Sequence, residues 1–126
     1  MVVIDDLTKK ILFFCLYLPK STAYSIAKNV AQIYGIKNGK EFAKLHRKIL
    51  YRIEKLVRDG LLLEEKYGRR PIKTYRIPMD RIFIYRSAIL IELNNDFIAV
   101  DCPYSCNPCD WRKCRIINEL RSKLEK

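Results

Sequence analysis

Residues 40–77 read KEFAKLHRKILYRIEKLVRDGLLLEEKYGRRPIKTYRI, and the pattern of this stretch changes at Gly60. Before Gly60, apolar residues recur at steps of three and four, which predicts an amphipathic helix over 40–59 that ends at this glycine. After Gly60 the pattern predicts two short strands and a turn between them, at 61–67, 72–77 and 68–71. The stretch is therefore predicted to be a long helix followed by a β-hairpin.

Two further helices are predicted upstream of this stretch. Asp5 and Asp6 precede an apolar stripe at helical spacing that Pro19 stops. Ser21 then has the character of an N-cap for a second helix, from Thr22 to about residue 33. Three helices and then a hairpin is the order of a winged helix-turn-helix. We therefore predict a mainly α protein with a small β-hairpin.

The chain is predicted to divide into a winged-helix domain, 1–79, and a small C-terminal cysteine module, 80–126. Residues 80–93 are apolar all round and rich in β-branched side chains, which fits either a buried helix or a strand. The turn residues 94–96 favour a hairpin of 88–93 with 97–101. A short helix is expected over 112–126.

The chain of 126 residues has 25 Lys and Arg against 14 Asp and Glu, a net charge of +11. The positive charge lies mainly in 1–79, whereas 80–101 is net negative. Such a charge suits a polyanionic partner, although a solubilising surface would look the same. No apolar run approaches the roughly 18 residues that a membrane span needs, so we expect a cytoplasmic protein without a membrane partner.

The third helix is predicted to carry its cations on the side opposite its apolar stripe, at about 100° per residue. This basic arc consists of Lys44, Arg47, Lys48, Tyr51, Arg52, Lys55 and Arg58. The hairpin adds Arg69, Arg70 and Lys73. A recognition helix and a basic hairpin tip can contact duplex DNA, and the scarcity of Asn and Gln favours phosphate contact over base reading. An acidic protein partner and a merely solvated face are the alternatives.

Four of the five cysteines lie in the run CPYSCNPCDWRKC, at 102–114. Thiolates that converge from such a short segment predict a metal site, with Cys102, Cys106, Cys109 and Cys114 as ligands. Structural zinc sites commonly use two separated knuckles, whereas a single tight run with spacings of two to four is common for iron–sulfur clusters. An iron–sulfur cluster is therefore favoured over zinc, with disulfides or uncoordinated thiols as the remaining alternative.

No set of residues suggests catalysis, so the protein is not expected to be an enzyme. We find neither a Ser/His/Asp arrangement nor a glycine-rich phosphate loop. Cys15 lies on the apolar face of the first helix and is expected to be a small core residue. His46 is expected at the edge of the core.

The joined pattern, LVRDGLLLEEKYGRRPIKTYRI followed by CPYSCNPCDWRKC, resembles the beta subunit of the archaeal general transcription factor E. That family is related to the winged-helix subunit of the RNA polymerase III initiation subcomplex. The winged-helix part of the resemblance is generic, and the cysteine run beside it is the specific part.

The resemblance implies a non-catalytic subunit of a basal transcription initiation factor. Such a subunit would pair with an alpha subunit, contact the RNA polymerase clamp and promoter DNA, and help to open the promoter. It implies a [4Fe-4S] cluster on the four cysteines. The alternative is a free-standing winged-helix repressor whose iron–sulfur or zinc site could sense redox state, which would normally bind DNA as a homodimer.

Overall fold

The computed structural model describes residues 4–18, 20–69, 72–86, 88–100, 102–104, 110 and 112–124. Within these residues the chain forms four α-helices and two small antiparallel sheets, so the fold is mixed α/β. The prediction of a mainly α protein with a small β-hairpin is confirmed in part, because the helices and the hairpin are present but the apolar segment after residue 80 adds a second sheet. The elements are α1 (Asp6–Tyr17), α2 (Ala23–Tyr34), α3 (Gly39–Arg58), β1 (Leu63–Tyr67), β2 (Ile72–Arg76), η1 (Met79–Arg81), β3 (Ile82–Tyr85), β4 (Ala88–Leu93), β5 (Asp96–Val100) and α4 (Arg115–Leu124).

Side-chain caps fix where the first three helices begin. Asp5 accepts a hydrogen bond from the amide of Thr8 at the start of α1, and Asn38 accepts one from the amide of Glu41 at the start of α3. Such caps satisfy backbone donors that the helix cannot. The N-cap of α2 is Thr22, which forms a capping box with Ser25.

Ser21, predicted to cap α2, has another role. Its hydroxyl donates to the carbonyl oxygens of Phe14, at 3.0 Å, and Leu18, at 3.2 Å. Its own carbonyl accepts from the amide of Tyr75, 2.8 Å away. Ser21 thereby bridges the end of α1 to strand β2, which explains why it is buried.

The end of α3 follows the prediction. Gly60 adopts a φ of +81° and follows the C-cap residue Asp59. The amide of Gly60 donates to the carbonyl of Val57 and that of Leu61 to the carbonyl of Leu56, at 3.1 and 3.0 Å. This αL closure turns the chain into β1, which pairs antiparallel with β2. Three helices followed by a hairpin are thus confirmed.

The second sheet has the strand order β3-β4-β5. The predicted hairpin of 88–93 with the following strand is present, with Leu93 opposite Asp96. Asn94 and Asn95 form its two-residue turn, with φ of 52° and 64°. Positive φ at both turn residues suits the twist of a tight hairpin. Strand β3 takes up the part of the apolar segment for which helix and strand were both open.

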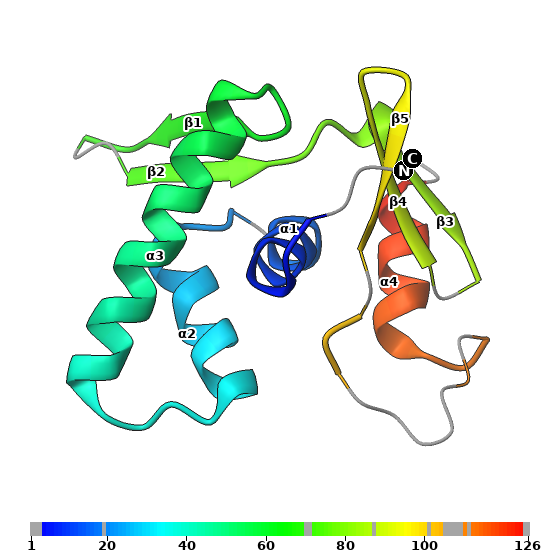
Figure 1. Ribbon diagram of the computed structural model, residues 1–126. Helices are drawn as coiled ribbons and strands as arrows, with labels where there is room; N and C mark the ends of the chain where they lie inside the picture. Colours follow the sequence, from blue (N-terminus) through cyan, green and yellow to red (C-terminus); the bar gives the residue numbers. More distant parts are fainter. Residues whose placement is uncertain are drawn as a thin grey trace.

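Helix α1 lies at the centre of the molecule, seen end-on in Figure 1. The helices α2 and α3 with the hairpin β1–β2 lie on one side of α1, and the second sheet with α4 lies on the other. Its residues 11–16 are all buried, and they belong to the same hydrophobic cluster as Ile49 of α3 and Ile91 of β4. The two predicted domains therefore share one core. The division of the chain into 1–79 and 80–126 stays a prediction.

No helix in the described part of the chain is both long and apolar enough to cross a membrane.

Candidate nucleic-acid interface and cysteine segment

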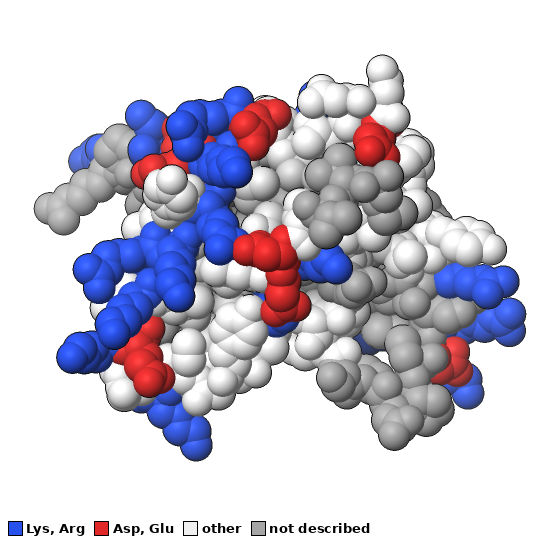
Figure 2. Space-filling model, in the orientation of Figure 1, with Lys and Arg blue, Asp and Glu red and all other residues white. Residues whose placement is uncertain are grey.

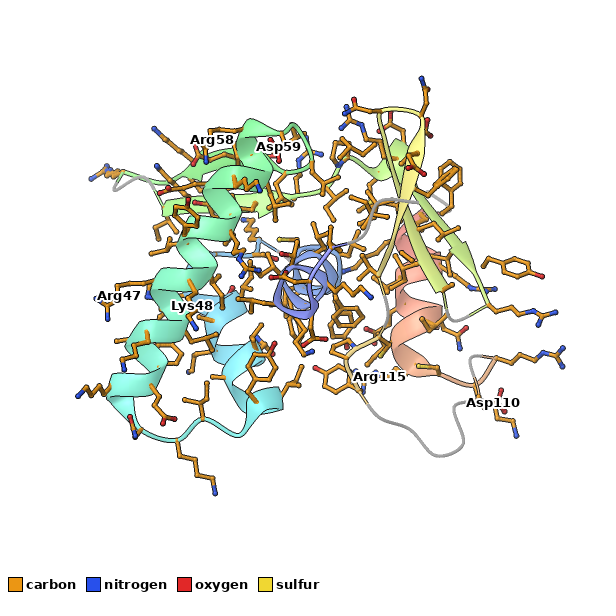
Figure 3. The ribbon with its side chains drawn as sticks, in the orientation of Figure 1. Arg47, Lys48, Arg58, Asp59, Asp110 and Arg115 are labelled. Atoms are coloured by element: carbon orange, nitrogen blue, oxygen red, sulfur yellow. The ribbon has the colours of Figure 1, made fainter. Side chains whose placement is uncertain are left out.

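Besides Arg58, five residues of the predicted basic arc lie exposed along one face of α3. We call them the basic face: Lys44, Arg47, Lys48, Tyr51 and Lys55. Figure 2 shows Lys and Arg gathered along α3 and continuing onto the hairpin. Arg47 extends away from the rest of the molecule, and Arg58 lies at the end of α3 nearest the hairpin (Figure 3). Since a helix presents one residue in three or four on the same side, a single helix is enough to align these cations.

The hairpin places two of its three predicted contact residues within the described part of the chain. Arg69 is exposed at the tip, and Lys73 is exposed on β2. The Nζ atom of Lys73 lies 3.5 Å from a carboxylate oxygen of Glu64 on β1, an exposed pair that a phosphate could displace at little cost. Arg70 lies outside the described residues.

Arg52 departs from the other members of the arc. Its guanidinium donates to the carboxylate of Asp5 and, at 3.2 Å, to the hydroxyl of Thr8. Its side chain is only 34% exposed. Burial alone would raise the pKa of Asp5, but the hydrogen bonds from Thr8 and Arg52 outweigh burial and lower it. Arg52 thus ties α3 to the start of α1, where its guanidinium is engaged with Asp5 and Thr8.

No sequence signal pointed to the pairing of Arg52 with Asp5. The two residues are 47 positions apart, and helical projection places Arg52 on the same side as the basic face. Only the packing of α1 against α3 brings the Asp5 carboxylate within reach.

The other two residues singled out from the sequence lie as expected. Cys15 is 5% exposed, and burial raises the pKa of its thiol to about 12, so it behaves as a small apolar core residue. His46 is half-buried and stacks on Phe42, with 6.1 Å between ring centroids. The ring of Tyr24 packs edge-on against both.

Two of the four predicted metal ligands can be placed. Cys102 is half-buried after β5, and Cys114 is half-buried directly before α4. Cys106 and Cys109 lie outside the described residues. Within the described part of the chain, no three His, Cys, Asp or Glu side chains are grouped to hold a metal ion. The complete four-cysteine set therefore stays a prediction.

The surroundings of these two cysteines suit thiolate ligands. The chain leaves β5 and enters α4 at the same end of the second sheet (Figure 1). Cys114 accepts a backbone hydrogen bond from Asn118 at the N-terminus of α4, where the helix dipole favours negative charge. Between the two cysteines, the amide of Lys113 donates to the carbonyl of Asp110, 3.1 Å away, in a tight turn.

Tyr104 anchors the start of the cysteine segment to the core. Its ring packs edge-on against Phe13 and Phe14 of α1, with centroids 6.1 and 6.4 Å apart. The thiols of Cys102 and Cys114 have the donor chemistry of a metal-binding group. Such a group would be a soft-ligand centre, an iron–sulfur cluster or zinc.

Comparisons of the chain with protein-family models, with curated proteins and with solved structures found no match.

Proposed function

We propose that this chain is a non-catalytic subunit of a transcription initiation factor that contacts DNA through α3 and the β1–β2 hairpin. One observation carries the proposal: Lys and Arg gather along α3 and onto the hairpin (Figure 2), where the basic face and Arg69 are exposed. The order of three helices and a hairpin supports a winged helix, in which these two elements are the ones that reach DNA.

The chemistry of the surface favours contacts with phosphates rather than with base edges. Three of its five cations are lysines, and the basic face contains neither Asn nor Gln. Lysine acts on phosphate as a point charge, whereas reading of base edges relies on bidentate donors. We therefore propose sequence-independent binding of promoter duplex, or of DNA that is being opened.

The cysteine segment has a different role in the proposal. We assign Cys102, Cys106, Cys109 and Cys114 to one structural group, a [4Fe-4S] cluster in preference to zinc. It would shape the surface that binds an alpha subunit of the factor and the RNA polymerase clamp. When bound, the group supplies cross-links between the end of β5, the intervening segment and the start of α4. The half-buried positions of Cys102 and Cys114 support this assignment.

DNA binding is tested by reversing the charge of Lys48 and of Arg69. Each substitution to Glu should weaken binding to a duplex and lower the slope of log K against log salt by about one, because one phosphate contact is lost. Fluorescence anisotropy of a labelled duplex across a salt series measures both effects. The control is Arg115→Glu, which makes the same change at an exposed site on α4, far from α3 (Figure 3).

Equal binding by the wild type, Lys48→Glu and Arg69→Glu would overturn the DNA proposal. The partner assignment has a separate test, an affinity pull-down from the native host without oxygen. Recovery of an alpha-like chain together with RNA polymerase would support the proposal of an initiation-factor subunit. Recovery of a homodimer on a single promoter would contradict it and favour a free-standing repressor.

A further inference from the structure

Beside the basic face lies a surface hollow that DNA contact does not explain. It is open to solvent and is bounded by α1, α3 and the chain that follows α2. Four largely apolar side chains line its floor: Leu7, Tyr34, Ile36 and Leu45. We call this feature the α3 hollow. Phosphate contacts need cations and leave an apolar floor without a role, whereas peptide-binding grooves combine an apolar floor with charged flanks.

The floor of the α3 hollow is held in place by its surroundings. The hydroxyl of Tyr34 donates to a carboxylate oxygen of Asp6, 2.9 Å away, and Lys10 lies 5.1 Å from the centroid of the same ring. Gly35, with a φ of +70°, ends α2, and the amide of Ile36 then donates to the carbonyl of Ala31. A floor that is already formed loses little conformational entropy when a partner binds.

The rim of the α3 hollow is cationic. Lys44, Arg47 and Lys48 line the hollow and are exposed. None of the three forms an ion pair within the described part of the chain. Against them the described lining holds one carboxylate, that of Glu41. The rim therefore favours an occupant with several negative charges.

An apolar floor and a cationic rim together specify the occupant. We propose that the α3 hollow is the docking site for a short amphipathic segment of a partner protein. That segment would bury large apolar side chains against the floor and place Asp and Glu side chains opposite Lys44, Arg47 and Lys48. Binding of a helix or extended peptide in a groove uses this combination of apolar anchors and charged flanks.

One consequence connects this proposal to DNA. The rim lysines and Arg47 also belong to the basic face, so the acidic segment and a duplex would compete for the same cations. This exclusion rests on the proposed DNA binding, whereas the docking site itself does not.

The test selects ligands from a random library of displayed peptides of about 16 residues, enough for four helical turns, on the immobilised full chain. We expect the selected peptides to share apolar residues at helical spacing next to Asp and Glu. Their binding should fall about tenfold or more with Ile36→Asp, which puts a charge on the floor, and with the double variant Lys44→Glu/Lys48→Glu.

Two controls separate docking from general charge effects. Ile72→Asp makes the same substitution at an exposed site on β2 and should leave peptide affinity unchanged. The DNA measurement uses Ile36→Asn, because Ile36→Asp would add a negative charge beside the rim cations. Ile36→Asn should lower peptide affinity and keep the wild-type affinity for duplex DNA. Circular dichroism must show that each variant is folded.

Three results would overturn the docking proposal. The first is a set of selected peptides without acidic or without apolar residues. The second is equal binding of those peptides by the wild type and Ile36→Asp. The third is a dimer of the chain, seen by sedimentation velocity, that Ile36→Asp converts to a monomer, since the occupant would then be a second copy. If the wild-type chain bound the selected peptides but not duplex DNA, only the proposed function would be refuted.

Discussion

The two sides of α1 differ in how they meet solvent. On one side, α3 is a regular helix whose outer face is lined with cations. On the other side, the second sheet exposes aromatic rings, with Phe83 and Phe97 edge-on at 5.9 Å between centroids. The first side thus presents a row of cations along one helix and the second a pair of exposed phenylalanine rings, although both sides pack on the same helix. We propose DNA contacts on the first side and the cysteine group on the second.

The largest expected effect comes from breaking the core that the two sides share. Phe13 of α1 is fully buried and contacts Phe14 and Tyr104. Phe13→Ala should lower the free energy of unfolding by about 3–5 kcal/mol, through lost burial and the cavity that remains. Phe97→Ala removes the same side chain from a site that is 39% exposed, and its cost should be well below that.

The same experiment tests whether the two sides unfold together. Helix content by circular dichroism reports mainly on α1, α2 and α3, whereas the fluorescence of Trp111 reports on the C-terminal segment. Urea transitions that coincide in the wild type and move together in Phe13→Ala would establish one cooperative unit. Two separate transitions would instead favour the predicted division into 1–79 and 80–126.

A smaller effect, confined to one side, is expected from Cys114→Ser. If the four cysteines hold a metal group as proposed, loss of one thiolate ligand should remove the iron or zinc. Affinity for duplex DNA should stay at the wild-type value, because the basic face lies on the other side of α1 (Figure 1). Metal analysis and visible absorbance of protein purified without oxygen, with anisotropy on the same samples, provide the measurements.

Cys15→Ser is the matched control for Cys114→Ser. It alters a cysteine in the core and should leave the metal content unchanged, at some cost in stability. If Cys114→Ser abolished DNA binding as well as lowering the metal content, the assignment of separate roles to the two sides would fail. Retention of full metal content in Cys114→Ser would remove Cys114 from the ligand set.

The smallest effect is expected at the contact between Asp5 and Arg52. Asp5→Ala removes both the N-cap of α1 and the ion pair and should cost about 1 kcal/mol. Asp5→Asn keeps a capping side chain and removes the charge, so it should cost less, within the range of about 0.2–1 kcal/mol for exposed pairs. Urea unfolding at neutral pH distinguishes the two variants.

The pH dependence of this contact has a definite sign. The pKa of Asp5 is lower in the folded protein than its ordinary value of 3.8, so the carboxylate stabilises the fold above that value. The contribution is lost as the pH falls below 3.8 and through the folded pKa. The stability difference between the wild type and Asp5→Asn should therefore shrink below about pH 4. A difference that stays constant down to pH 2 would rule out this role for the Asp5 charge.

The sequence alone determined the features that depend on local patterns. Apolar spacing located the three helices, Gly60 marked the end of α3, and Asn94-Asn95 marked the turn of the second hairpin. The exposure of Lys44, Arg47, Lys48, Tyr51 and Lys55 followed from helical projection. Each of these depends on residues a few positions apart, whose geometry the backbone sets by itself.

Only the tertiary structure decided which of these residues meet across the fold. In the folded chain Arg52 pairs with Asp5, and Ser21 bonds to Tyr75 rather than capping α2. The α3 hollow forms only where α1, α3 and the end of α2 meet. The tertiary structure also paired β3 with β4, where sequence left helix and strand open. These contacts join residues far apart along the chain, and the packing of buried side chains on α1 brings them together.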